Sequence, residues 1–166
     1  MEIMSRNSST VAALVVLFVS PAFAQQTDPP TFAPAFFAFE NGVSFGSVEN
    51  DAKTLRELGY AGISQAHAGG EKLAQQVAAF DKAGLKVLSV YLNVGDTPVA
   101  EELIKPLANR DALIEITVRA ITPKTVEAVR QTAEMASKLN IRVALYPHHG
   151  NAIATMPQAM NLIAKV

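Results

Sequence analysis

The sequence predicts a parallel α/β fold built from about five βα units. Short apolar segments rich in β-branched and aromatic residues alternate with longer amphipathic segments, which is the pattern of strands that alternate with helices. At three joints, "RELGYAGIS", "DKAGLKVLS" and "SKLNIRVAL", a glycine or asparagine follows a helical pattern and an apolar residue restarts the chain. A residue in the left-handed conformation commonly ends a helix in this way. Together these observations predict a chain of βα repeats.

Five strands and five helices are predicted in alternation. The predicted strands are 34–40, 61–64, 85–93, 113–120 and 141–146. The predicted helices are 47–59, 71–84, 97–107, 124–140 and 155–166. Threonine followed by proline opens the third and fourth helices, at Thr97-Pro98 and Thr122-Pro123, because threonine caps a helix and proline suits its first turn. The first two helices carry these apolar residues on one face: Val48, Ala52, Leu55 and Leu58, then Leu73, Val77 and Phe80.

The composition is that of an ordinary globular domain. Of the 166 residues, 49% are hydrophobic and 17% are charged, and the formal net charge is −1. There is no basic excess of the kind that lines a nucleic-acid groove, so we expect no nucleic-acid partner. The chain contains no cysteine, which excludes disulfides, thiolate catalysis and cysteine metal ligands.

Residues 1–24 predict a Sec-type signal peptide. Arg6 lies in a short polar lead, the apolar run "VAALVVLFV" follows, and Ala22-Phe23-Ala24 forms a small-x-small cleavage site. The apolar run is shorter than the roughly 20 residues of a spanning helix, and an uncleaved anchor is the alternative. We therefore expect an exported protein, periplasmic or extracellular, that is not held at the membrane after cleavage. Residues 25–34 predict an extended, proline-punctuated leader into the domain, residues 35–166.

Two architectures fit the βα pattern, an open doubly wound sheet and part of a (β/α)8 barrel. The chain is long enough for an open five-stranded sheet, whereas a closed barrel needs about 250 residues. The strand 113–120 favours the barrel, because Glu115, Thr117 and Arg119 alternate with apolar residues. A central strand of a doubly wound sheet is covered on both faces and is expected to be apolar on both. One polar face instead suits the lumen of a barrel.

Four phrases of the chain, "FFAFENG", "LRELGYAGI", "AAFDKAGLKVLSVYLN" and "MASKLNIRVALYPHHG", together resemble the sugar phosphate isomerase/epimerase family. The resemblance extends over residues 35–166 and implies the xylose-isomerase-like TIM-barrel fold, which endonucleases of abasic DNA repair share. It implies a partial barrel of about five βα units, because strands six to eight would lie beyond Val166. It also implies proton transfer next to a sugar carbonyl, with a divalent metal held by carboxylates and histidine.

Three functions are open at this point. An exported sugar or sugar phosphate isomerase or epimerase, with a small-molecule carbohydrate as substrate, follows from the resemblance if the site is complete. A non-catalytic exported sugar-binding module, or an inactive barrel fragment, is the alternative. An abasic-site nuclease is disfavoured by the predicted export and by the absence of a basic excess in the sequence.

The segment "YPHHG" carries the clearest prediction of a site. In the resemblance, a metal-binding glutamate stands where this chain has Tyr146, and His148 matches the family histidine. A phenol is neutral near pH 7 and cannot replace a carboxylate as a ligand of a hard cation. We therefore expect no metal ligand at Tyr146 and a sugar-binding role for His148, with His149 beside it as a further candidate.

Four other residues are candidates for substrate binding. Glu40 ends the first predicted strand and His67 follows the second, where each could reach a ligand or simply lie in a solvated loop. Glu115 and Arg119 share one face of a strand, about 13 Å apart by the rise per residue. They could hold opposite ends of a polyol, or satisfy neighbouring groups in the lumen.

The outer strands of a five-stranded parallel sheet predict self-association. The first and the last strand, "FFAFE" and "RVALY", would each have a free edge. Neither carries an internal proline or lysine, the residues that discourage pairing between edges. We therefore expect either a dimer formed edge to edge or poor solubility.

Overall fold

The structure of the chain is a computed structural model that describes residues 34–166. The predicted signal peptide, residues 1–24, and nearly all of the predicted leader, residues 25–34, lie outside the described residues. Pro34–Val166 forms one compact unit. Within it, every helix is too short or too polar to cross a membrane.

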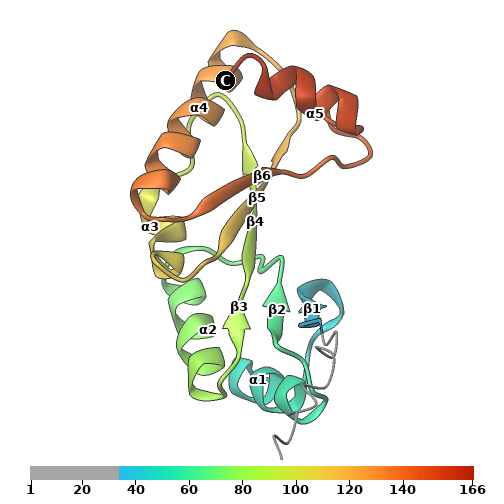
Figure 1. The fold of residues 1–166 in the computed structure, drawn as a ribbon, viewed down its shortest axis with the longest axis vertical. Coiled ribbons are helices and arrows are strands. Elements are labelled where there is room, and N and C mark those ends of the chain that lie inside the picture. Colours follow the sequence, from blue (N-terminus) through green and yellow to red (C-terminus); the bar gives the residue numbers. More distant parts are fainter. Residues whose placement is uncertain (1–33) are drawn as a thin grey trace, which may run out of the picture. The chain divides into compact units, whose positions relative to one another are not determined.

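Six strands and five α-helices alternate along this part of the chain (Figure 1). The strands are β1 (Phe37–Phe39), β2 (Gly62–Ser64), β3 (Lys86–Val87), β4 (Ser89–Val94), β5 (Leu113–Val118) and β6 (Arg142–Leu145). The α-helices are α1 (Val48–Glu57), α2 (Gly70–Lys82), α3 (Glu101–Ile104), α4 (Pro123–Lys138) and α5 (Met156–Ile163). Two 3-10 helices, η1 (Glu40–Gly42) and η2 (Lys105–Leu107), follow β1 and α3. All strand pairs in this range are parallel, which confirms the predicted parallel α/β class.

Neighbouring strands follow the order of the chain, β1-β2-β3 in one sheet and β4-β5-β6 in the other. The two sheets are joined at the junction of β3 and β4. Ala66 forms a parallel bridge to Val90, and the backbone of Leu88 forms hydrogen bonds to β2 and to β5. A doubly wound sheet reverses its strand order at a switch point, and no reversal occurs from β1 to β6. The order excludes the open doubly wound alternative and is that of a partial TIM barrel. In Figure 1, α2, α3 and α4 follow one side of the strands.

The prediction of one continuous strand over residues 85–93 was wrong at Leu88. The amide of Leu88 donates to the carbonyl of Ile63 at 2.8 Å, whereas its carbonyl accepts from the amide of Leu113 at 3.0 Å. β3 therefore pairs with β2, and β4 pairs with β5. Leu88 is the residue at which this part of the chain changes its partner strand.

The third helix begins at Glu101, so the predicted start at Thr97-Pro98 was wrong. The amide of Val99, a buried residue, donates to the Thr132 hydroxyl of α4 at 3.0 Å, and this contact holds the backbone outside a helix. The α-helical part is also short, because Pro106 lacks an amide hydrogen and cannot continue the α-helical bonding pattern. The 3-10 helix η2 contains that proline.

The predicted start of the fourth helix and the predicted ends at the three joints are confirmed, whereas the fifth helix ends at Ile163 and not at residue 166. The hydroxyl of Thr122 accepts a backbone amide of the first turn of α4 at 3.0 Å. Gly59, Gly84 and Asn140 have φ angles of 82°, 69° and 55°, the left-handed conformation expected at the three helix-to-strand joints. Leu58 is the exception to the predicted apolar face, because it follows the last turn of α1 and its side chain is 64% exposed.

The two faces of β5 differ as the barrel prediction requires. Ile114, Ile116 and Val118 are buried in the hydrophobic core. Glu115 and Thr117 alternate with them and lie on the opposite face, which is the lumen side. Polar side chains therefore gather on the lumen side of the central strand.

Candidate functional site

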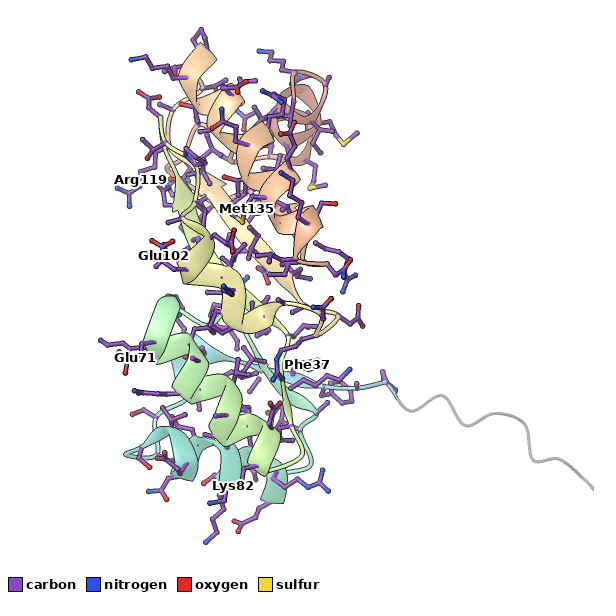
Figure 2. The ribbon with its side chains drawn as sticks, turned by 90° about the vertical axis from the view of Figure 1, so that its left-hand side faces the viewer. Phe37, Glu71, Lys82, Glu102, Arg119 and Met135 are labelled. Atoms are coloured by element: carbon purple, nitrogen blue, oxygen red, sulfur yellow. The ribbon has the colours of Figure 1, made fainter. Side chains whose placement is uncertain are left out.

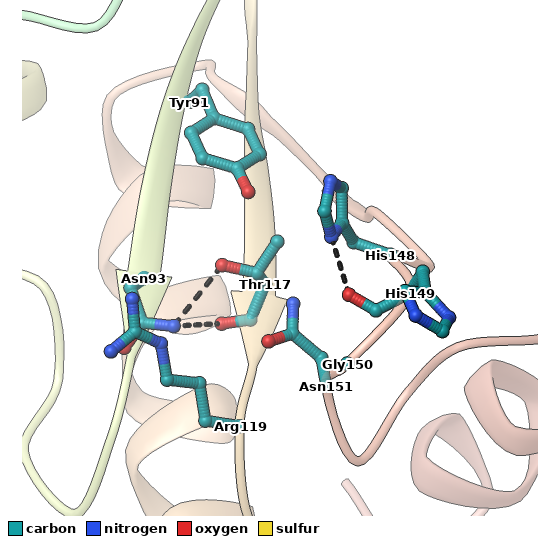
Figure 3. A pocket seen from close by; sticks show the side chains of 8 residues that line it. All are labelled: Tyr91, Asn93, Thr117, Arg119, His148, His149, Gly150 and Asn151. Atoms are coloured by element: carbon teal, nitrogen blue, oxygen red, sulfur yellow. Dashed lines mark hydrogen bonds between the residues drawn. The ribbon is translucent and has the colours of Figure 1, made fainter.

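A pocket of about 490 Å³ opens at the carboxyl ends of β4 and β5, beside the loop that joins β6 to α5 (Figure 3). Its lining residues come from these three segments: Tyr91, Asn93, Thr117, Arg119, His148, His149, Gly150 and Asn151. Parallel α/β folds place their ligand sites at the carboxyl ends of the strands. The volume lies within the range of roughly 300–1,000 Å³ that small-molecule sites occupy.

The floor of the pocket is a pair of polar side chains that bind each other. Asn93 of β4 and Thr117 of β5 are opposite in register. The amide nitrogen of Asn93 donates to the carbonyl and the hydroxyl oxygen of Thr117, at 3.2 and 3.1 Å. The Thr117 hydroxyl donates in turn to the carbonyl of Leu92 at 3.3 Å. These contacts make the floor a fixed surface.

The loop after β6 places both histidines at the rim of the pocket. The amide of Asn151 donates to the carbonyl of His148 at 3.1 Å, and Gly150 supplies the left-handed residue of the turn, with φ of 83°. Nδ1 of His148 lies 2.8 Å from the carbonyl oxygen of His149. Because a carbonyl only accepts, Nδ1 carries the proton, and Nε2 of the neutral imidazole presents a lone pair.

A second cluster, formed by Glu40, His67 and Gln76, lies at the carboxyl ends of β1 and β2. One carboxylate oxygen of Glu40 accepts from the backbone amide of His67 and lies 3.0 Å from its Nδ1. The other oxygen accepts from the side-chain amide of Gln76 at 2.6 Å. Because a carboxylate only accepts, it fixes the proton of His67 on Nδ1 and leaves Nε2 available as a base.

Gln76 supports Glu40 from the buried side. It comes from α2, and only 6% of its surface is exposed. Its amide nitrogen binds Glu40, whereas its buried Oε1 has no hydrogen-bond partner within residues 34–166. An unpaired buried oxygen lowers stability, since it loses its hydrogen bonds to water. Gln76 therefore orients Glu40 at some expense to the stability of the fold.

Four aromatic rings, which we call the aromatic row, connect the second cluster to the pocket. The ring centroids are 5.6 Å apart for His67 and Tyr91, and 5.5 Å apart for Tyr91 and Tyr146. The centroids of Tyr146 and His148 are 6.0 Å apart. The row extends from the end of β2 over β4 to the loop after β6. It gives the lumen side a continuous aromatic surface.

Glu115 lies on the lumen face of β5, in register with Tyr91 of β4 and Ala144 of β6. Its carboxylate accepts from the side-chain amide of Gln65. Gln65 follows β2 in a left-handed conformation, with φ of 56°, and its backbone amide donates to the Ser89 hydroxyl oxygen at 2.7 Å. This turn directs the side chain of Gln65 toward Glu115.

The six predicted substrate-binding residues fall into three groups. The first group lines the pocket: Arg119, His148 and His149. The second is the hydrogen-bonded pair of Glu40 and His67, at one end of the aromatic row. The third is Glu115, which is bound by a glutamine and does not line the pocket. The structure thus brings Arg119 and the two loop histidines together, and separates Arg119 from Glu115.

Sequence reasoning missed four amide side chains: Gln65, Gln76, Asn93 and Asn151. Gln76 carried a signal, because it is a polar residue on the apolar face of its predicted helix, beside Leu73 and Val77. Asn93 carried a weaker signal, as a polar residue of an alternating strand. Nothing in the sequence marks Asn151, because its position depends on the turn at Gly150.

The divalent metal implied by the family resemblance does not fit the described side chains. Within residues 34–166, histidine and acidic side chains do not gather in groups of three or more that could hold an ion. The carboxylates of Glu40 and Glu115 are held in separate contacts, the first by His67 and Gln76 and the second by Gln65, so they do not converge on one point. Tyr146 supplies a neutral phenol where the resemblance places a glutamate.

Comparison with known proteins adds information about the fold. No family model and no curated protein matches the sequence. A 3-keto-D-glucoside 4-epimerase from E. coli has a similar structure, with a TM-score of 0.60 and 15% sequence identity, over 80% of this chain and 64% of that chain. A probable 3-DHS dehydratase involved in petrobactin synthesis from Bacillus anthracis has a TM-score of 0.59 and 16% identity, over 80% of this chain and 59% of that chain.

These similarities confirm the fold that the sequence predicted. Both extend over most of the described part of the chain and agree with the unreversed strand order. At 15% and 16% identity, what is shared is the fold alone. The chain spans 64% of the length of the first protein and 59% of the length of the second.

Proposed function

We propose that the chain binds a small-molecule carbohydrate at the carboxyl ends of its strands and catalyses proton transfer next to the sugar carbonyl. This is the chemistry of sugar isomerases and epimerases, and one protein of similar fold is a 3-keto-D-glucoside 4-epimerase. The observation that carries the proposal is the 3.0 Å contact between Glu40 and Nδ1 of His67. The sugar would lie along the aromatic row, whose ring faces can pack against its C–H groups.

The Glu40–His67 pair has the arrangement of a general base. The carboxylate holds the imidazole in one tautomer, so that Nε2 can accept a proton from the carbon next to a carbonyl. The adjacent carboxylate then stabilises the imidazolium, and no proton passes to Glu40. Gln76 binds the other oxygen at 2.6 Å, and this second contact restricts rotation of the carboxylate.

His148 offers the ligand a second imidazole, at the pocket end of the aromatic row. Its Nδ1 points at the carbonyl of His149, so Nε2 is the ring nitrogen available to a ligand. His148 and His67 stand at opposite ends of the aromatic row. Three ring-to-ring steps separate the two imidazoles, so His67 itself would return the proton that it removes, and His148 would bind the far end of the ligand. Arg119, in the same pocket as His148, would bind oxygen atoms at that end of the ligand.

Exchange of carbon-bound hydrogen tests the proposal. The full chain is incubated in D2O with a panel of aldoses, ketoses and keto-glycosides, and NMR follows deuterium incorporation next to the carbonyl. We expect exchange with at least one sugar, slowed about 100-fold or more by His67→Gln and also slowed by Glu40→Gln. Glu71→Gln, which neutralises an exposed glutamate of α2, is the matched control. Exchange that His67→Gln leaves unchanged would contradict the proposed base.

A non-catalytic sugar-binding module is the second candidate function. It is supported by Tyr146, which stands where the resemblance places a metal-binding glutamate, and by the poor fit of the described side chains to a metal. In the same NMR experiment, such a module would show saturable chemical-shift changes on adding a sugar, without deuterium incorporation. An inactive fragment would show neither.

We also propose that the protein is exported, with residues 1–24 as its signal peptide. The apolar run and the Ala22-Phe23-Ala24 site support this. The ligand would then be a periplasmic or extracellular carbohydrate. A net charge of −1 supports the expectation that nucleic acid is not a partner.

A further inference from the structure

Strand β6 and helix α5 form one incompletely covered end of the strand order. β6 contains no buried residue, whereas four of the six residues of β5 are buried. Among the described strands, β6 pairs only with β5, so its other edge presents unpaired backbone groups. Helix α5 buries Ala159 and Leu162, while Met156, Met160 and Ile163 are each more than half exposed. We call this end of the chain, residues 141–166, the C-terminal face.

The exposed residues of α5 form an apolar stripe. Met156, Met160 and Ile163 are spaced by four and three residues, so they lie on one side of the helix. Between Arg142 and Lys165 the sequence contains no lysine, arginine, aspartate or glutamate. A helix with apolar residues on two sides is expected to be covered on both. The stripe therefore has the character of a contact surface.

Strand β1 is at the other end of the strand order and is also incompletely covered. It pairs only with β2 among the described strands. Phe36, Phe39 and Phe45, which lie at this strand and in the loop before α1, are exposed. Phe37, labelled in Figure 2, belongs to the same strand. We call this end of the chain, residues 34–52, the N-terminal face.

The two faces carry opposite charge. The N-terminal face contains three acidic residues and no basic one, whereas the C-terminal face contains two basic residues and no acidic one. The basic residues are Arg142, which pairs with Asp111, and Lys165. Contact between two like faces would bring charges of one sign together, whereas contact between unlike faces would pair opposite charges. The charges therefore favour contact between unlike faces.

We propose that the C-terminal face of one copy of this chain docks against the N-terminal face of a second copy. β6 would lie beside β1 of the second copy and parallel to it, which continues the parallel pairing found within each chain. The apolar stripe of α5 would then be covered by the second copy. The net charge of −1 is too small to oppose self-association. The docking is independent of the proposed carbohydrate function.

The docking would also join two ends of the candidate site. The carboxyl ends of neighbouring parallel strands lie at the same edge of a sheet. Glu40 directly follows β1, and His148 lies in the loop after β6. Within one chain, all the other strands lie between β1 and β6. Between two docked copies, the strand that leads to Glu40 and the strand that leads to His148 would instead be neighbours.

Mixing two variants, each blocked at one face, tests the proposal. Phe36→Lys combined with Phe39→Lys blocks the N-terminal face, and Met160→Lys blocks the C-terminal face, because a charge is costly to bury in an apolar contact. Sedimentation velocity across a dilution series measures the association of the purified protein. We expect the wild type to associate, and each blocked variant to require about tenfold higher concentration or more.

An equimolar mixture of the two blocked variants should form 1:1 dimers at concentrations where each variant alone is monomeric. Each variant retains the face that the other lacks, so one contact remains possible between them. The pair should stop at the dimer, because its outer faces are both blocked. A contact between two unlike faces predicts this recovery, whereas a contact between two like faces does not.

Asn161→Lys is the matched control, because it adds the same charge at an exposed position of α5 outside the stripe. It should associate as the wild type does. If Asn161→Lys weakens association as much as Met160→Lys, the effect is one of charge and the proposal is overturned. Circular dichroism checks that each variant is folded. Met160→Ala, which shortens the side chain without adding a charge, takes the place of Met160→Lys if that variant does not fold.

The remaining outcomes overturn the proposal. A mixture that stays monomeric shows that the two faces do not dock. Undiminished association of the variant blocked at the N-terminal face indicates contact between two C-terminal faces, and the converse result indicates contact between two N-terminal faces. A wild type that is monomeric at every concentration excludes the docking, and it leaves the deuterium-exchange test of the carbohydrate function unaffected.

Discussion

The ring of Tyr91 packs edge to face against the ring of Tyr146, with centroids 5.5 Å apart and planes at 85°. Tyr91 belongs to β4 and Tyr146 directly follows β6, whereas β5 lies between these two strands. The contact therefore crosses the central strand on its lumen side, above the face that carries Glu115. It joins two strands that share no backbone hydrogen bond.

The Tyr91–Tyr146 contact is expected to contribute a measurable coupling energy. A double-mutant cycle with Tyr91→Ala and Tyr146→Ala should give about 1 kcal/mol in urea unfolding, the usual value for an edge-to-face pair. Phenylalanine at either position should retain most of it. A cycle that pairs Tyr91→Ala with Tyr60→Ala, in the turn after α1, should give a coupling near zero. A coupling near zero for Tyr91 and Tyr146 as well would mean that the rings do not pack in solution.

Gln76→Leu should slow deuterium exchange while preserving or raising stability. The leucine would fill a buried position and remove the unpaired Oε1, but Glu40 would lose the amide that orients it. Exchange rates and thermal unfolding are measured on the same samples. Gln75→Leu, at the exposed neighbouring position, is the control and should leave the exchange rate unchanged. An unchanged rate in Gln76→Leu would show that Glu40 needs no such support.

The ionised carboxylate of Asp96 should stabilise the folded chain at neutral pH, and this contribution should be lost in acid. The hydroxyls of Thr122 and Thr125 donate to its carboxylate at 2.8 and 2.9 Å, and they hold the pKa of that carboxyl below its ordinary value. A lowered folded-state pKa gives stability that is present above the unfolded-state pKa and is lost as pH falls through the folded-state pKa. Asp96→Asn should therefore lower stability at pH 7 and flatten the acidic side of the stability curve. Parallel curves for the two proteins would refute this.

The signal peptide should be cleaved after Ala24. N-terminal sequencing of protein recovered from the periplasm or the medium is expected to begin at Gln25. Ala24→Arg should block processing, because the cleavage site requires a small residue. Protein recovered outside the cytoplasm that still begins at Met1 would contradict the prediction.

Self-association should depend on the edge at β1. Among the described strands, β1 and β6 each pair on one side only. Phe36 and Phe39, at this edge, are 67% and 46% exposed. Replacing both with lysine should shift the association measured by light scattering to higher concentration. Leu58→Lys, a change at an equally exposed apolar position outside the sheet, should have little effect. A wild-type chain that stays monomeric at every concentration would rule the association out.

The sequence predicted the fold class well because that class depends on local patterns. The joints at Gly59, Gly84 and Asn140 are set by residues within one helix turn, and each was confirmed. The same local signal, threonine followed by proline, succeeded at Thr122 and failed at Thr97. The failure has a distant cause, since a hydroxyl on α4 binds the backbone at Val99. The break at Leu88 likewise depends on two partner strands.

The candidate site was predicted residue by residue, but its contacts were not. Glu40 and His67 were each predicted from their position at the end of a predicted strand. The hydrogen bond between them depends on the register between β1 and β2, which the sequence does not show. Arg119 and His148 line one pocket for a similar reason, because the loop after β6 folds back over β5, where the amide of Ala152 donates to the carbonyl of Val118. The placement of Gln65 beside Glu115 depends on a left-handed backbone conformation at Gln65, which glutamine rarely adopts and which the sequence therefore does not indicate.

At the junction between the two sheets, a side chain performs a task that elsewhere belongs to the main chain. Ser89 is fully buried, and its hydroxyl oxygen accepts the amide of Gln65 where a carbonyl would otherwise serve. A carbonyl is present whatever the residue, but a hydroxyl can be deleted by one codon change. The hydrogen bond at this junction therefore depends on the identity of one residue, Ser89. Since Gln65 holds Glu115, a replacement at Ser89 would reorient a lumen carboxylate without touching it.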